Sequence, residues 1–400
     1  MKARKIKEKI IESILLASSS ITSITVLLIV VFLFSQGVSL FGDSTVEKGS
    51  VMAVNKNNPV KELTGSQIKE IFDQNVVYWN EIGGKKDTII LFRIDDIGNY
   101  YSDEEIGENF EGLSECVSRL VDSIPGILAY FPEKYLSKNF KGKVLPLEKV
   151  SLKTLFKGKE WFPSAQPAAQ IGAMPLILGT LWVSLGAILL ALPLGLATAV
   201  YMSDIAHGKV RRVMKPLIEL LAGIPSVVYG FFGLIVIVPL VQQVFNLPVG
   251  ETALSGSIVL GIMALPTIIT VSEDAMRNTP RAMKEASLAL GATKWQTIYR
   301  VVIPCSASGI TAGAILGIGR AIGETMAVLM VTGNAAVIPH TILEPVRTIP
   351  ATIAAELGEA AQGGLHFKAL FALGCILFII TLIINLLVES ISASNKHKSH

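Results

Sequence analysis

The sequence predicts an all-α polytopic membrane protein with six transmembrane helices and a small α/β extracytoplasmic domain between the first two. Of its 400 residues, 51% are hydrophobic and only 17% are charged. The mean hydropathy is +0.54, which is too high for an ordinary soluble domain. The apolar residues gather in stretches of the roughly 20 residues that a helix needs to cross a bilayer. Each stretch must be helical, because an isolated strand in lipid would leave its backbone groups unpaired.

Six apolar stretches are long enough to be the transmembrane helices. They lie at about residues 14–36, 173–203, 214–241, 252–272, 306–331 and 369–389. The first follows a basic start and superficially resembles a secretory signal. It is too long for the apolar core of a signal, and no A-x-A cleavage site follows it. We therefore expect a retained first helix.

Basic residues at the ends of these stretches predict the orientation of the chain. Lysine and arginine collect before the first stretch, between the second and third, and between the fourth and fifth, whereas residues 242–251 and 332–368 are nearly free of them. Cytoplasmic loops carry the excess of such residues. We expect a multi-pass protein of the cell (inner or plasma) membrane with both termini in the cytoplasm.

The predicted parts of the chain follow from these stretches. They are a cytoplasmic tail with the first helix at 1–41, an extracytoplasmic domain at 42–170, a five-helix core at 171–390 containing a cytoplasmic loop at 273–304, and a cytoplasmic tail at 391–400. Within the polar domain, residues 66–72 have apolar side chains at helical spacing, while 88–92 and 127–131 are typical of short strands. This mixture predicts an α/β unit.

Composition excludes several classes of function. The net charge of +3 is too small for a nucleic-acid partner, and no patch of basic and aromatic residues occurs. His340 and His366 have no second ligand at metal-binding spacing, so neither a metal nor another cofactor is expected. No G-x-x-x-x-G-K-S/T motif is present, so the chain cannot hydrolyse ATP by a P-loop mechanism. No nucleophile and base stand at useful spacing, and we do not expect an enzyme.

The strongest motif lies in the cytoplasmic loop 273–304. It reads E-A-S-L-A-L-G from Glu285 to Gly291, and the loop closes on V-V-I-P at Pro304. Glu285 to Leu290 is expected to form a short helix with a small, smooth face, and Gly291 to allow a sharp backbone turn. Residues at a spacing suited to an interfacial helix follow: Trp295, Ile298, Tyr299 and Val302. The alternative interpretation is an ordinary amphipathic loop.

This loop resembles the EAA loop of ABC importer permeases. In that family E-A-A, three residues, G, nine residues and I-x-L-P form the coupling helix that docks in a cleft of the ATPase. The spacing here matches throughout, with serine in place of the second alanine. The resemblance implies the type I importer permease fold and ATP hydrolysis by a partner subunit. It assigns ATPase coupling to Glu285, Ala286, Ser287, Gly291 and Pro304.

A second motif places charged residues inside the apolar stretch 306–331, where the sequence runs G-R-A-I-G-E-T from Gly319. Ionisable residues in a membrane are costly unless paired or hydrated, and by default they mark a pathway or a functional pair. Arg320 and Glu324 are four residues apart, so we expect them to share one helix face and to be able to pair. Gly319 and Gly323 leave room for a neighbouring backbone or a substrate. The alternative is a buried structural pair.

This segment resembles the R-A-x-G-E-T-M-A-V signature of the PstC-type permeases of phosphate-uptake ABC transporters. The resemblance includes A-G-I-P-S-V-V-Y-G at Ala222–Gly230 and covers about residues 171–389. It implies that Arg320, Glu324 and Thr325 line the pathway of inorganic phosphate. It also implies a homologous sister permease, two ATP-binding cassette ATPase subunits and a soluble phosphate-binding protein as partners. A permease for sulfate or molybdate, or a phosphate-sensing membrane component, are the alternatives.

The predicted extracytoplasmic segment has a resemblance of its own, to part of a phosphate-binding protein. The similarity lies in residues 54–84 and in S-I-P-G-I-L-A-Y at 123–130. Where such receptors have Ser-Gly-Thr after an arginine, this chain has I-G-N at 97–99, after Arg93. Two hydroxyl donors are therefore absent. We expect a degenerate domain that docks a partner or shapes the external mouth, with a working phosphate site as the alternative.

Overall fold

The computed structural model describes residues 2–46, 48–107 and 109–397, and side chains only from residue 9 to residue 390. The side chains of the predicted basic start and of the tail 391–400 lie outside this description. The chain forms two units, which we describe separately. The larger comprises Met1–Gly37, Ala173–Ala360 and Leu370–His400, and the smaller comprises Val38–Gly172 and Ala361–Ala369.

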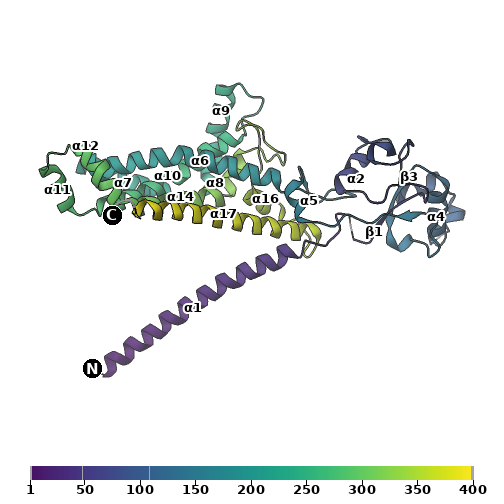
Figure 1. Ribbon diagram of the computed structural model, residues 1–400, viewed down its shortest axis with the longest axis horizontal. Coiled ribbons are helices and arrows are strands. Elements are labelled where there is room, and N and C mark those ends of the chain that lie inside the picture. The colour runs from purple at the N-terminus through teal and green to yellow at the C-terminus, as the bar shows by residue number, and fades with distance from the viewer. Residues whose placement is uncertain (1, 47, 108, 398–400) are drawn as a thin grey trace. The chain divides into compact units, whose positions relative to one another are not determined.

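Helices make up the larger unit (Figure 1). They are α1 (Lys2–Val38), α6 (Met174–Val200), α7 (Gly208–Ala222), α8 (Ser226–Phe232), α9 (Val238–Phe245), α10 (Ala253–Arg277), α11 (Arg281–Ala289), α12 (Lys294–Thr297), α13 (Ile303–Cys305), α14 (Ala307–Gly323), α15 (Met326–Val331), α16 (Ile349–Glu356) and α17 (Leu365–His397). The π-helical turns are η4 (Tyr201–Ile205), η5 (Gly233–Ile237) and η6 (Ile298–Val302). The long helices α6 and α14 both pack along α10, which is the centre of the unit.

Five of the described helical segments are long and apolar enough to cross a membrane. They are Lys9–Val38, Met174–Ile205, Ser226–Phe245, Ala253–Arg277 and Leu365–Ser390. A sixth arises if Lys294–Cys305 and Ala307–Gly323, which meet at a bend of 71°, count as one broken span. The predicted stretches at 14–36, 173–203, 252–272 and 369–389 overlap four of these segments, whereas those at 214–241 and 306–331 need correction.

The predicted span 214–241 is wrong in its first part. Residues 214–222 belong to α7, a separate helix in which basic side chains alternate with apolar ones, and α7 ends before Gly223. Pro225 has extended backbone (ψ 143°) and precedes α8. Proline has no N–H group to continue a helix, and it forces the residue before it away from helical geometry. The apolar span therefore begins at Ser226.

The predicted span 306–331 is not one helix either. The helix α14 ends at Gly323, and Glu324 has extended backbone with φ −72° and ψ 133°. The next helix, α15, begins after Thr325. Residues four apart lie on one face only while the helix continues. The expectation that Arg320 and Glu324 share one helix face is therefore wrong.

The smaller unit contains a four-stranded sheet of order β2-β3-β1-β4. The strands are β1 (Ser50–Val54), β2 (Ile90–Arg93), β3 (Ile127–Pro132) and β4 (Lys143–Val144), and a separate pair is formed by β5 (Trp161–Phe162) and β6 (Gln170–Ile171). The helices are α2 (Gly65–Phe72), α3 (Asp103–Ile106), α4 (Leu113–Ser123) and α5 (Leu152–Lys157), with 3-10 turns η1 (Trp79–Ile82), η2 (Ile94–Asn99) and η3 (Glu133–Tyr135). The central strand β3 pairs parallel with β2 and antiparallel with β1. The helix predicted at 66–72 and the strands predicted at 88–92 and 127–131 are confirmed, each within two residues.

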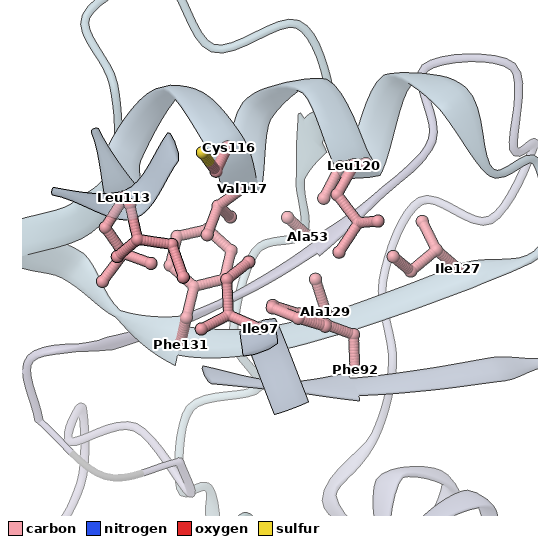
Figure 2. Close-up of a cluster of buried hydrophobic side chains, with 12 residues drawn as sticks. Ala53, Phe92, Ile97, Leu113, Cys116, Val117, Leu120, Ile127, Ala129 and Phe131 are labelled. Carbon is pink, nitrogen blue, oxygen red and sulfur yellow. The ribbon is translucent and has the colours of Figure 1, made fainter. Parts of the chain in front are cut away.

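Both faces of this sheet are buried. On one face α4 places Val117 and Leu120 over Phe92 of β2 and Phe131 of β3, as Figure 2 shows. On the other face the apolar side of α2 packs around Trp79, whose indole nitrogen donates a hydrogen bond of 2.9 Å to the Gly126 carbonyl. A strand with two buried faces must be apolar throughout, which explains the uninterrupted apolar sequence of β3.

Candidate functional site

Glycines form the face of α14 that packs against α10. A Cβ atom at Gly309 would lie 2.2 Å from the Cβ of Ala275, and one at Gly317 would lie 2.6 Å from Cγ1 of Ile268. At Gly313 the nearest atom would be the hydroxyl oxygen of Ser272, at 3.0 Å. Real Cβ atoms essentially never approach as closely as those at Gly309 and Gly317 would, and at Gly313 the neighbour would have to shift, so glycine allows the two helices to touch on this face.

A second face of α14 is open at two of its glycines. A Cβ atom at Gly319 or Gly323 would meet nothing within 4 Å. Between them Arg320 is half-buried, and one turn earlier Leu316 is 55% exposed. We call the surface formed by Leu316, Gly319, Arg320 and Gly323 the open face. The sequence predicted that these glycines leave room beside Arg320, and the structure confirms the space.

The open face ends where the helix breaks. Glu324 and Thr325 are both half-buried and lie between α14 and α15. The short helix α15 is held by α8, because Gly230 brings the two backbones together: a Cβ there would lie 2.9 Å from Cα of Ala327. The sequence-predicted pathway residues are thus adjacent along the chain, but no ion pair joins Arg320 to Glu324 among the described side chains.

The predicted coupling segment forms a helix and a turn. Glu285, Ala286 and Ser287 lie on α11, and Gly291 has φ +86°, a left-handed conformation that glycine adopts without strain. Pro304 lies in α13, at the end of the helical segment that runs from Lys294 to Cys305 and directly after the π-helical turn η6. The predicted short helix and the sharp turn after it are therefore confirmed.

Apolar side chains project from this segment into open surroundings. Leu290 is 88% exposed, Trp295 60%, Met283 46%, Leu288 45% and Tyr299 41%. We call these five residues the coupling surface. Of the predicted interfacial set, Ile298 and Val302 instead point inward and are buried. An exposed apolar patch of this kind marks a surface that another molecule covers.

Two side chains on the inward side of α11 tie it to the rest of the unit. The Lys284 ammonium donates a hydrogen bond of 2.6 Å to Oδ1 of Asp204 in η4. The hydroxyls of Ser287 and Thr297 are 3.0 Å apart. The sequence marked Lys284 only as one of the basic residues of the predicted cytoplasmic loop. Its contact with Asp204 was not predicted, because the two residues are 80 positions apart.

A buried carboxylate joins α7 to the end of α10. Glu273 is 1% exposed, and it accepts hydrogen bonds from Arg211 and, at 2.9 Å, from the Lys215 ammonium. Lys215 also donates to Asp274 at 2.7 Å. Hydrogen bonds to Asp274 and Glu273 raise the pKa of Lys215, since they favour its charged form. The two cations were predicted only as cytoplasmic loop charges. One feature of the sequence could have indicated this cluster: the acidic pair Glu273-Asp274 directly follows the apolar stretch 252–272, and basic residues gather at 209–215.

In the smaller unit Arg93 borders a cavity of about 270 Å³ at the carboxyl ends of β2 and β3. Its guanidinium lies over the ring of Phe72, 5.1 Å from the centroid. Ile97 occupies the position at which phosphate-binding proteins have the serine of Ser-Gly-Thr, and here it is buried in the apolar core. Asp95 also lines the cavity. The lining also includes the polar side chains of Ser50, Tyr130 and Gln166. The guanidinium of Arg93 is therefore accompanied by hydrogen-bond donors, and the carboxylate of Asp95 opposes an anion there.

These features agree with a membrane permease, and the comparison with known families identifies its class. The sequence model of the family "Binding-protein-dependent transport system inner membrane component" matches residues 191–396. The chain belongs to this family. It is a multi-pass inner-membrane permease component of an ABC importer and not itself an enzyme.

The relatives narrow the class further. The "Probable ABC transporter permease protein YqgH" of Bacillus subtilis is 35% identical over 284 residues, which cover 71% of this chain and 90% of the relative. The "Phosphate transport system permease protein PstC" of Mesorhizobium japonicum is 38% identical over 245 residues, 56% of this chain and 74% of the relative. Among solved structures, the inward-facing MetNI methionine ABC transporter is 18% identical over 55% of this chain and 96% of its own, with a TM-score of 0.44. The resemblance to PstC-type permeases is confirmed.

Proposed function

We propose that this chain imports inorganic phosphate, forming half of the translocation pathway with a homologous sister permease. The observation that carries the proposal is the open face of α14, where half-buried Arg320 stands between two glycines at which an added Cβ atom would meet nothing within 4 Å. A guanidinium presents a planar fork of donors that matches two phosphate oxygens. The relatives named as phosphate permeases support the choice of anion.

In this proposal Glu324 and Thr325 border the same pathway at the break between α14 and α15. A carboxylate near the guanidinium would limit how tightly an anion is held, because like charges repel. Binding that is too strong would slow release, so such a balance suits transport. In alternating access, rocking of the helices makes the open face accessible first from one side of the membrane and then from the other.

The coupling surface is proposed as the docking site of a separate ATPase subunit. Glu285 and Ala286 are exposed on α11, next to exposed Leu288 and Leu290. ATP binding closes a pair of such subunits, and α11, Gly291 and Pro304 convert this closure into movement of the spans. The smaller unit is proposed to lie outside the membrane and to dock a soluble phosphate-binding protein or shape the external mouth, with both termini in the cytoplasm.

Labelled phosphate uptake tests the substrate. The chain would be reconstituted in vesicles with its sister permease, ATPase and receptor, and uptake of phosphate, sulfate and molybdate would be compared. Arg320→Lys keeps the charge but loses the fork, so phosphate uptake should fall by about tenfold or more, the order expected for a lost bidentate contact. Arg212→Lys, at an exposed position of α7, is the matched control.

Two results would contradict this assignment of substrate. One is uptake of sulfate or molybdate in preference to phosphate, which would identify another oxyanion. The other is unchanged phosphate uptake by Arg320→Lys, which would make Arg320 a structural residue.

Co-purification tests the docking site. Leu290→Asp places a charge in the centre of the coupling surface and should abolish recovery of the ATPase with the chain. Leu152→Asp, at an exposed leucine of the smaller unit (61%), should leave that recovery unchanged. Equal recovery with both variants would rule out docking at this surface.

A further inference from the structure

The inward side of α11 carries an ion pair, Lys284–Asp204, that is not part of the coupling surface. Lys284 precedes Glu285 directly, and its ammonium lies 2.6 Å from the carboxylate of Asp204. Both side chains are mostly buried, with 22% and 13% of their surfaces exposed. A long lysine side chain held in this way has lost most of its rotamer freedom, so the contact is a defined one.

Asp204 sits at the cytoplasmic end of a long helix. It lies in η4, which continues α6 without a break, and Ser203 also contacts its carboxylate. Helix α6 packs closely on α10: a Cβ atom at Gly195 would lie 2.8 Å from Cγ2 of Ile268. A close-packed helix moves as a unit. Displacement of Asp204 is therefore passed to the body of the unit.

The covalent connections of α11 are less direct. On one side α10 ends at Arg277, and Pro280 with extended backbone (ψ 130°) precedes α11. On the other side the chain turns at Gly291 in a left-handed conformation. Backbone turns of this kind can absorb a rotation of the helix between them. A side-chain link from the middle of α11 to α6 bypasses both turns.

We propose that the Lys284–Asp204 ion pair is a strut that carries movement of α11 to α6, which makes both residues positioning residues for the coupling of ATP hydrolysis to transport. The inference rests on the proposed function, since it requires α11 to be moved by an ATPase. It goes beyond that function by assigning the route of the movement. Removal of the strut should let α11 turn with the ATPase while α6 lags behind.

The test is the ratio of phosphate transported to ATP hydrolysed, measured on the reconstituted complete transporter. Lys284→Glu and Asp204→Lys each set like charges opposite one another, and each should lower the ratio by about tenfold, within the range of coupling between contacting residues. The ATPase should still co-purify with both variants, because the coupling surface is unaltered. The exchanged pair, Lys284→Glu with Asp204→Lys, should restore the ratio to within about twofold of the wild type.

Lys209→Glu is the matched control, because it makes the same charge change on the same predicted cytoplasmic side, at an exposed position in the first turn of α7. It should leave the ratio unchanged. Wild-type ratios in the single variants overturn the strut. So does an exchanged pair as defective as the single variants, since that result marks the pair as structural. A wild-type chain that never binds an ATPase is a different failure: it overturns the proposed function, and the strut with it.

Discussion

The two faces of α14 use the same residue type for opposite purposes. Gly309 and Gly317 let α10 approach so closely that a single methyl group would collide. Gly319 and Gly323 face empty space, with Arg320 between them. Glycine on the first face closes a contact within the chain, whereas on the second an added Cβ atom would meet nothing within 4 Å. Charged side chains divide in the same way: Glu273 is buried among cations, whereas Arg320 lies on the open face and Glu324 follows directly after it.

The largest expected effect concerns these charges. Glu273→Gln leaves Arg211 and Lys215 facing a neutral side chain in a mostly buried cluster. Removing one partner of a buried ion pair is strongly destabilising, and we expect a loss of about 3 kcal/mol in the free energy of unfolding of the full chain. Glu324→Gln, at the break that follows the open face, should change that free energy by less than about 0.5 kcal/mol. Equal losses in denaturant titrations of the two variants would erase the distinction.

A methyl group should have opposite effects on the two glycine faces. Gly309→Ala forces α14 away from Ala275, and overpacking of this kind should cost about 2 kcal/mol of unfolding free energy. Gly319→Ala meets no atom and replaces a poor helix former by the best one, so it should stabilise the chain by about 0.5 kcal/mol. Thermal unfolding of the two purified variants measures whether each substitution lowers or raises the stability of the chain. A destabilising Gly319→Ala would mean that the face is not open.

The smaller unit contains a mostly buried ion pair whose strength depends on pH, between Asp43 and Lys368. Asp43 binds Lys368, which is 16% exposed, at 2.7 Å, and Lys48, which is 72% exposed, at 3.5 Å. Burial raises the pKa of Asp43, but the hydrogen bond and charge of Lys368, with Lys48, outweigh burial and hold the pKa below its ordinary value of 3.8. The stabilisation is therefore complete above pH 3.8 and is lost as the pH falls through the lower folded-state pKa.

Asp43→Asn should accordingly lower the free energy of unfolding by about 1 kcal/mol near neutral pH. The difference from the wild type should shrink below pH 3.8. Lys368→Met should reproduce the neutral-pH loss, and Lys48→Met should have about a third of it, because an exposed ion pair is weak. Stability measured against pH for the three variants checks this order, and a larger effect of Lys48→Met would reverse it.

Local patterns predicted local structure well. The E-A-S-L-A-L-G motif predicted a short helix and a turn, and α11 with Gly291 agrees, because both depend on residues a few positions apart. The contacts that hold α11 and α10 in place were not predictable. Arg211 lies 62 residues from Glu273, and Lys284 lies 80 residues from Asp204. Nothing in the local sequence tells which of several basic residues meets which acid.

Two breaks in apolar stretches were missed for a shared reason. Hydropathy averages over many residues, so one or two extended residues leave the average unchanged. The predicted span 214–241 runs through Pro225, although this residue separates α7 from α8. Glu324 follows a glycine, and no other sign distinguishes it from a helical residue. The site residues of the second motif were therefore predicted as a set, but their relative geometry was not.

The bare side chain of Leu290 has a consequence for the life of the protein in the cell. Under the proposed function, a newly made copy awaiting its ATPase would present this leucine and Trp295 to the cytosol. Chaperones and proteases recognise proteins that expose unassembled apolar surfaces. We therefore expect the half-life of the chain to lengthen as its ATPase becomes more abundant, so that supply of the motor sets how many copies of this subunit survive.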